Sequence, residues 1–78
     1  MTDNEKAVMT DCYKFLNDFG NPPPKSDPGC DEFWEKAADR LREVYMGNKY
    51  HPLAEGVGCA VYTYIEEKWK AINRKRGL

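Results

Sequence analysis

The sequence predicts an all-α fold, a three-helix bundle with a proline-rich connector between its first two helices. Apolar residues recur at intervals of three and four along three segments, at about 3–19, 30–46 and 52–75. The only stretch rich in β-formers, 61–65, lies inside the third segment and has no hairpin partner. Because 78 residues allow one domain, we expect residues 1–78 to form a single helical unit.

The first helix is expected over residues 3–19. Thr2 and Glu5 have the spacing of a capping box, in which a hydroxyl and a carboxylate three residues on satisfy each other's backbone N–H groups. Gly20 follows the last periodic residue and suits a left-handed position after the helix end. The predicted buried face consists of Val8, Cys12, Phe15, Leu16 and Phe19.

Residues 20–29 are expected to connect the first two helices without helical structure. Three consecutive prolines, Pro22 to Pro24, forbid a helix and favour an extended polyproline II course. Such a segment can serve as a ligand for an SH3-type or WW-type domain, or as a stiff spacer. The absence of a P-x-x-P repeat and of a flanking aromatic residue favours the spacer.

The second helix is expected over residues 30–46. Asp31 and Glu32 in its first turn complement the helix dipole, and Gly47 with Asn48 is a stop signal. The predicted apolar stripe consists of Phe33, Trp34, Ala37, Ala38, Leu41, Val44 and Tyr45.

The third helix is expected over residues 52–75. Gly56 and Gly58 each cost a helix roughly 1 kcal/mol relative to alanine, so the alternative is a break with the helix starting near Cys59. If the helix is continuous, small residues at 54, 58 and 60 allow another backbone to approach closely. The predicted core of the bundle is Val8, Cys12, Phe15, Leu16, Phe19, Phe33, Ala37, Leu41, Val44, Leu53, Val57, Val61, Ile65 and Ile72, with Trp34, Tyr45, Tyr64 and Trp69 closing its edges.

Composition and charge fit a globular domain that has little area to bury. Hydrophobic residues make up 41% of the chain, charged residues 32%, and the net charge is −1. A chain this short has a thin margin of stability, which helix packing or a second copy of the chain must supply. The acidic, polar N-terminus does not resemble a secretory signal, and no apolar run is long enough to span a bilayer, so we expect a cytoplasmic protein without membrane contact.

Metal, cofactor and catalytic sites are not expected. Cys12, Cys30, Cys59 and His51 could form a Cys₃His set by count, but no closely spaced cysteine pair exists. Cys12 and Cys59 fit buried helix faces, and Cys30 is surrounded by acidic residues that disfavour a thiolate. Adjacent carboxylates on a helix do not face each other, so no acid–base pair is indicated. We therefore expect no enzyme activity.

The aromatic residues favour an interaction surface. Ten of the 78 residues are aromatic, more than three short helices can bury, and tyrosine and tryptophan are favoured at protein interfaces. We expect a non-catalytic interaction module whose third helix contacts a protein partner or a second copy of the chain, as a homodimer. The predicted contact residues are Tyr62, Tyr64, Trp69, Gly56 and Gly58. The alternative is a purely structural role, in which these aromatic side chains only cover the edge of the core.

The C-terminal end carries a second candidate surface. Residues 68–78 hold five basic side chains and no acidic one: Lys68, Lys70, Arg74, Lys75 and Arg76. These cations either complement the dipole of the third helix or contact nucleic acid. Weak association with nucleic acid is therefore the alternative function.

A resemblance covers about the last 45 residues. The segment 31–36 (DEFWEK), then a charged helix, then 51–54 (HPLA) leading into 64–68 (YIEEK), resembles a group of short helical proteins from Firmicute bacteria and their phages or mobile elements. The group has no assigned activity, so the resemblance implies a bacterial, cytosolic accessory role and transfers no site residue.

Overall fold

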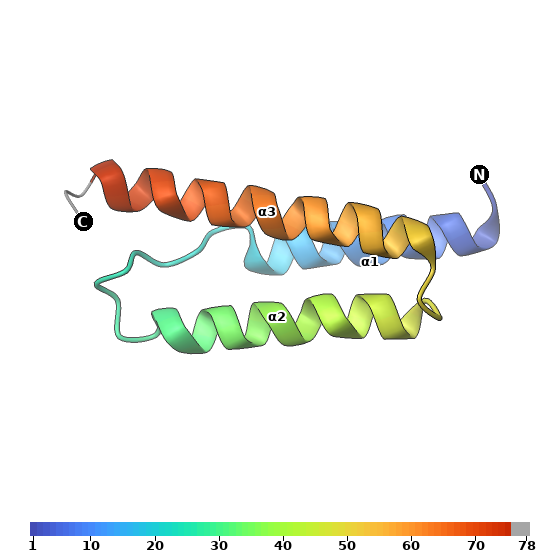
Figure 1. Ribbon diagram of the computed structural model, residues 1–78, viewed down its shortest axis with the longest axis horizontal. Helices are drawn as coiled ribbons and strands as arrows, with labels where there is room; N and C mark the ends of the chain where they lie inside the picture. Colours follow the sequence, from blue (N-terminus) through green and yellow to red (C-terminus); the bar gives the residue numbers. More distant parts are fainter. Residues whose placement is uncertain (76–78) are drawn as a thin grey trace.

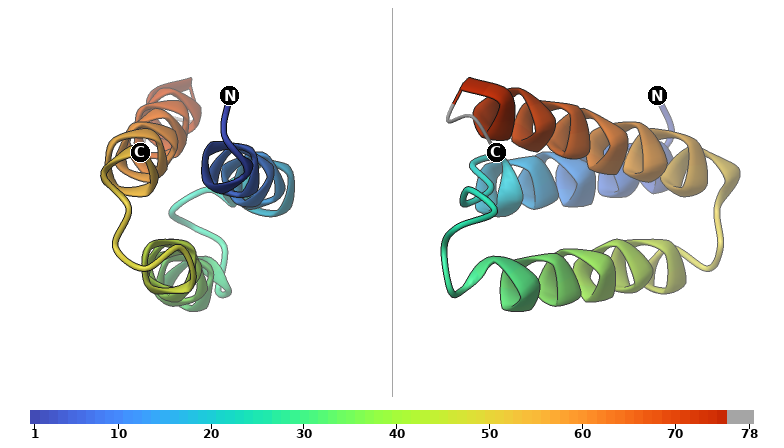
Figure 2. Two further views of the ribbon diagram at one scale, coloured as in Figure 1. Left: turned by 90° about the vertical axis from the view of Figure 1, so that its right-hand side faces the viewer. Right: turned by 60° about the vertical axis from the view of Figure 1, so that its left-hand side comes forward.

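The computed structural model describes residues 1–75 and consists of three helices, α1 (Asp3–Phe19), α2 (Cys30–Gly47) and α3 (Pro52–Lys75). All three pairs of helices pack against each other, which confirms the predicted three-helix bundle. α1 and α3 run in the same direction and α2 runs opposite to both (Figure 1). Seen along the bundle in Figure 2, the three helices lie at the corners of a triangle.

The start of α1 is fixed by the predicted capping box, and the helix ends at Phe19 as expected, whereas the left-handed conformation expected for Gly20 was wrong. The Glu5 N–H donates to Thr2 Oγ1 at 3.2 Å, and the Thr2 N–H donates to Glu5 Oε1 at 2.7 Å. Gly20 is not left-handed but right-handed, with φ −72° and ψ −9°. It is buried, and a Cβ at this position would collide with the carbonyl of Leu16. Gly20 is therefore suited to its place by close packing and not by backbone conformation.

The connector 20–29 is anchored to the C-terminal half of α3. It extends past the end of α1 and follows α3 before it turns back to α2 (Figure 1). Pro22 is buried, and the Lys25 N–H donates to Oδ1 of Asn73 at 2.9 Å. Asn73 is 7% exposed, so a buried amide on α3 fixes the path of the connector.

The link between α2 and α3 contains two non-glycine residues in the left-handed region, Lys49 with φ 55° and Tyr50 with φ 59°. The Tyr50 N–H donates to the Tyr45 carbonyl at 2.9 Å, and the two tyrosine rings meet edge-on with centroids 4.9 Å apart. These contacts offset a backbone conformation that costs roughly 1–2 kcal/mol for each such residue.

The core is divided into two clusters along the bundle. One cluster contains Val8, Cys12, Val44 and Ala54, and the other contains Phe15, Ala37 and Ile65. Two predicted positions were wrong. Leu16 is 37% exposed and Tyr64 is 54% exposed, because each lies about 100° around its helix from the fully buried neighbour, Phe15 or Ile65.

The helix α3 continues through both glycines, and they have different surroundings. At Gly58, which is buried, a Cβ would lie 2.9 Å from Cδ1 of Leu41 on α2. At Gly56, which is exposed, a Cβ would meet nothing within 4 Å. Gly58 therefore lets α2 and α3 approach, whereas Gly56 leaves open surface. None of the helices among residues 1–75 has the length and apolar character needed to cross a membrane.

Candidate interaction surface

The aromatic side chains separate into an internal cluster and a set that faces solvent. Trp34 on α2 is the centre of the internal cluster, with ring centroids 5.7 Å from Tyr62 and 5.6 Å from Trp69 on α3. Phe33 extends the cluster at 5.1 Å from Trp34. Edge-on contacts of this kind are favourable beyond the area that they bury. Tyr62 and Trp69 therefore help to hold α3 against α2.

The polar atoms of this cluster, the Tyr62 hydroxyl and the indole N–H groups of Trp34 and Trp69, are also affected by burial. Burial raises the pKa of the Tyr62 hydroxyl, and the nearby carboxylate of Glu66 raises this pKa further. The indole N–H groups of Trp34 and Trp69 are buried and have no hydrogen-bond partner among the described residues. A donor without a partner costs stability, on the order of 1–3 kcal/mol, so apolar packing must offset this cost.

The five predicted contact residues consequently lie in two places. Tyr62, Trp69 and Gly58 are turned toward α2, where their contacts are internal. Tyr64 and Gly56 are open to solvent. The structure does not bring these five residues together into one surface.

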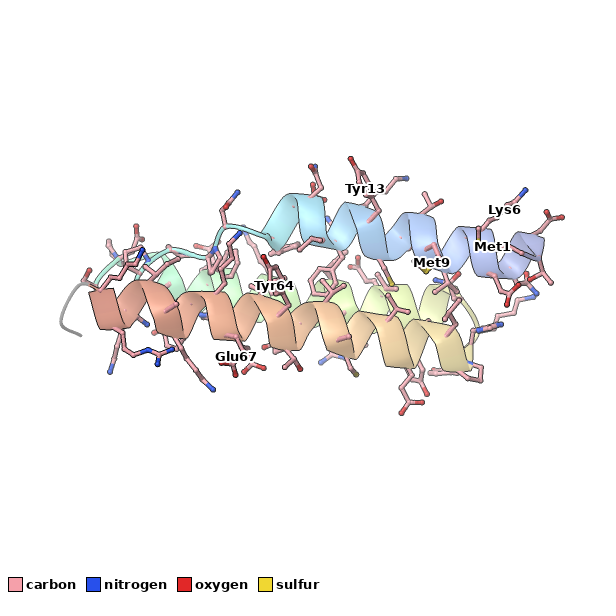
Figure 3. All side chains as sticks on the ribbon, turned by 90° about the horizontal axis from the view of Figure 1, so that it is seen from above. Met1, Lys6, Met9, Tyr13, Tyr64 and Glu67 are labelled. Atoms are coloured by element: carbon pink, nitrogen blue, oxygen red, sulfur yellow. The ribbon has the colours of Figure 1, made fainter. Side chains whose placement is uncertain are left out.

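A different apolar surface is formed where α1 and α3 lie side by side, on the side away from α2. We call it the α1–α3 face; its residues are Met9, Tyr13, Leu16, Gly56, Ala60 and Tyr64. Its largest side chains are 44% (Met9), 71% (Tyr13), 37% (Leu16) and 54% (Tyr64) exposed. Figure 3 looks onto this face, with Met9 and Tyr13 on α1 and Tyr64 on α3.

Helical spacing places these residues in two rows. Met9, Tyr13 and Leu16 follow one another at steps of four and three, and Gly56, Ala60 and Tyr64 at steps of four, so each row lies along one side of its helix. The row on α1 was missed from the sequence, because Leu16 was assigned to the core. The available signal was the spacing of Met9 and Tyr13, which places both beside the buried stripe and not within it.

The opposite side of α1 is closed by polar contacts to α2 and to Asn48, which follows α2. Arg40 donates to Asp18 Oδ2 at 2.8 Å, and Asn48 donates to Asp11 Oδ2 at 2.9 Å. The hydrogen bond from Arg40 is the main reason that the pKa of the Asp18 carboxyl is lowered. These contacts cover one flank of α1, and the exposed side chains of Met9, Tyr13 and Leu16 lie outside them.

None of the six residues of the α1–α3 face carries a charge. Lys6 and Glu67, which have opposite charges, are visible around the face in Figure 3. Lys68 lies beside Tyr64: its Nζ donates to the Gly20 carbonyl at 2.8 Å and is 5.8 Å from the centre of the Tyr64 ring. Lys68 thus joins α3 to the residue that follows α1 and places its ammonium over the ring of Tyr64.

The basic C-terminal end has its own hollow, of about 470 Å³, between α3 and the connector. Two of the predicted basic residues line it, Lys70 and Arg74, together with Lys25, which sequence reasoning missed. Lys70 Nζ lies 3.5 Å from Glu67 Oε1, so part of its charge is balanced. Of the other predicted residues, Lys68 is engaged with Gly20, Lys75 ends α3, and Arg76 lies outside the described residues.

The cysteines and the histidine have separate surroundings. Cys12 and Cys30 are buried, and burial, followed by the nearby Asp11, raises the pKa of the Cys12 thiol. The expectation that Cys59 is buried was wrong, since it is exposed. His51 Nδ1 accepts the Leu53 N–H at 3.1 Å, which caps the start of α3. Within residues 1–75, no three potential histidine, cysteine or carboxylate ligands lie close enough together to hold a metal ion.

The chain matches no family model, and no curated protein or solved structure is significantly similar to it. The candidate function therefore depends on the surfaces described above.

Proposed function

We propose that this protein is a small, non-catalytic interaction module that contacts a protein through its α1–α3 face. The observation that carries this proposal is the exposure of Tyr13 and Tyr64, at 71% and 54%, beside exposed Met9 and Leu16. Aromatic residues and methionine are enriched at protein interfaces, and charged residues are depleted from interface centres. The face has this composition.

The area of the face supports a functional reading. An aromatic side chain can bury roughly 150–250 Å², so Tyr13 and Tyr64 together expose on the order of 250 Å². Met9, Leu16 and Ala60 add to this area on the same side of the bundle. The total approaches the 300–600 Å² of the largest apolar patch on a typical monomer, a patch that is often functional.

Tyrosine footprinting tests this proposal with an internal control. Tyr50 is 57% exposed, close to the 54% of Tyr64, but it lies in the link between α2 and α3 and outside the face. The reactivity of each tyrosine toward a tyrosine-selective reagent is measured in dilute purified protein and in cells that produce it naturally. We expect Tyr13 and Tyr64 to be protected in cells while Tyr50 reacts equally in both settings. Equal reactivity of all three tyrosines in the two settings would contradict the proposal.

Weak association with nucleic acid is a second candidate function, supported by the hollow at the C-terminal end. Lys25, Lys70 and Arg74 line this hollow with one acidic residue, Glu67. The buried Asn73 holds the backbone of Lys25 against α3, which keeps cations of the connector and of α3 on the same side. Cations arranged in this way suit the phosphates of a nucleic acid backbone.

Binding to duplex DNA as a function of salt tests this second function. Fluorescence anisotropy of labelled DNA should show binding at low salt, and the slope of log K against log[salt] should be about −0.9 for each phosphate contacted. The Lys25→Ala/Arg74→Ala variant should weaken binding and reduce the slope, whereas Lys36→Ala, a matched exposed lysine on α2, should leave both unchanged. If no binding is detected at low salt, this candidate function is excluded.

A further inference from the structure

We infer that the partner of the α1–α3 face is a second copy of the chain, and that two α3 helices pair antiparallel across a two-fold axis at Ala60. This inference rests on the proposed function, since it names the partner of the same face. It is drawn from the row formed by Gly56, Ala60 and Tyr64, in which an open glycine, a small residue and an exposed aromatic follow one another at steps of four.

The row is complementary to itself. In a symmetric antiparallel pair of helices centred on residue 60, position 56 of one copy faces position 64 of the other, and the reverse contact is made by symmetry. The ring of Tyr64 is exposed, and nothing lies within 4 Å of a Cβ placed on Gly56. Each Tyr64 ring can therefore lie over the Gly56 of the partner copy. Ala60 at the axis allows the two backbones to approach without a large side chain between them.

The side of the bundle that carries the face is large enough for a stable pair. α1 is about 25 Å long at 1.5 Å per residue, and two adjacent helices span roughly 20 Å, so this side covers roughly 500 Å² in projection. Because side chains make a surface uneven, its accessible area is larger, which brings it close to the ~800 Å² per partner of a standard interface. The exposed Tyr13 and Leu16 on α1 widen the contact beyond the two α3 helices.

Charge does not oppose the pairing. Two copies present identical surfaces to each other, so a face with charges of one sign would repel itself. Here the six residues of the face are uncharged, and the charged residues around it have both signs, Lys6 and Lys68 as well as Glu67. The pairing also adds apolar burial to a chain in which Phe15, Ile65 and Val8 are the largest fully buried side chains.

Disulfide cross-linking tests the position of the axis. A residue on a two-fold axis faces its own copy, so Ala60→Cys, in a Cys59→Ser background, should form a covalent dimer under mild oxidation. The wild-type chain is the control, because the exposed Cys59 lies on the α2 side of α3, where it lines a hollow with Ala38 and Leu41, and Cys12 and Cys30 are buried. We expect the dimer from Ala60→Cys and not from the wild-type chain. The reverse result, or cross-linking of neither protein, would overturn the inference.

Sedimentation equilibrium tests the contact between Tyr64 and Gly56. Tyr64→Ala and Gly56→Leu should each raise the monomer–dimer Kd at least about tenfold, since one removes the aromatic ring and the other fills the space that it occupies. Tyr50→Ala, with a similarly exposed tyrosine outside the face, should leave the Kd unchanged. Circular dichroism checks that each variant is folded; both positions are exposed, so folding should be retained.

Two outcomes separate this inference from the proposed function. A wild-type chain that stays monomeric at high concentration overturns self-pairing. If Tyr13 and Tyr64 are nevertheless protected in cells, the face binds a different protein and the proposed function stands. If the chain dimerises but Tyr64→Ala and Gly56→Leu do not weaken the dimer, the pairing uses another surface and the inference is wrong.

Discussion

Replacing each glycine of α3 by alanine should have different effects on stability, although the two positions are two residues apart. Alanine is favoured over glycine inside a helix by roughly 1 kcal/mol. At Gly56 a Cβ meets nothing within 4 Å, so Gly56→Ala should raise the free energy of unfolding by about this full amount. For a domain of this size, about 1 kcal/mol corresponds to a rise in Tm of roughly 4–8 °C.

At Gly58 the gain in helix propensity is opposed by packing. The new Cβ would lie 2.9 Å from Cδ1 of Leu41, so the Leu41 side chain must move. Overpacking typically costs about 1–3 kcal/mol. Because Leu41 is only half-buried and the methyl group that must move is the flexible end of its side chain, we expect this cost to be about equal to the free energy gained from helix propensity. We expect Gly58→Ala to leave the stability within about 0.5 kcal/mol of wild type or to lower it.

Thermal and urea unfolding at low protein concentration, chosen to favour the monomer, measures both variants. The matched pair is informative because the chemical change is the same and only the surroundings differ. If Gly58→Ala stabilises the chain as much as Gly56→Ala does, Gly58 is not packed against Leu41. If Gly56→Ala destabilises the monomer, α3 is not a continuous helix with an open surface at Gly56.

Four further predictions concern the capping box, the connector and the cysteines. Thr2→Ala should lower the free energy of unfolding by about 1 kcal/mol in urea titrations. Hydrogen bonds with the Thr2 backbone and then with the Thr2 side chain lower the pKa of the Glu5 carboxyl, so the stabilisation from these bonds is present above the ordinary pKa of a glutamate and is lost as the pH falls through the lowered value. Circular dichroism should therefore show fraying of α1 only at acid pH. Fraying near neutral pH would contradict this. Asn73→Ala should speed exchange of the Lys25 amide hydrogen, since it removes the acceptor for that N–H, and unchanged exchange would show that the connector is held by other contacts. Cys59 should react at once with a thiol reagent while the two buried cysteines react only on unfolding, and fast reaction of all three would contradict their burial.

The sequence was sufficient to predict the fold because the helical signals agree with one another. The capping residues Thr2 and Glu5, the prolines at 22–24 and the stop at Gly47 each depend on local chemistry, and each marks an observed boundary of regular structure. Continuity of α3 through its glycines was also predicted correctly, since tertiary contacts along the helix outweigh the propensity cost of two residues.

The candidate site was harder to predict because it depends on which flank of each helix is covered. Periodicity showed that Leu16 and Tyr64 lie near the apolar stripe, but only the placement of α1 beside α3 shows that both residues are left exposed. Tyr62 and Trp69 lie in the same region of sequence as Tyr64 but pack onto Trp34, a contact between residues far apart in the chain. Single-sequence patterns carry no information about such a contact.

Site-specific photo-crosslinking tests the central claim most directly, namely that the α1–α3 face is the contact surface. A photoreactive phenylalanine analogue is placed at position 64 in one variant and at position 50 in another, where the native tyrosines are 54% and 57% exposed. The account predicts that irradiation of cells yields a heavier covalent product from position 64 and none from position 50; the further inference of self-pairing predicts a product with twice the mass of the chain. A product from position 50 alone, or from neither position, would contradict the account.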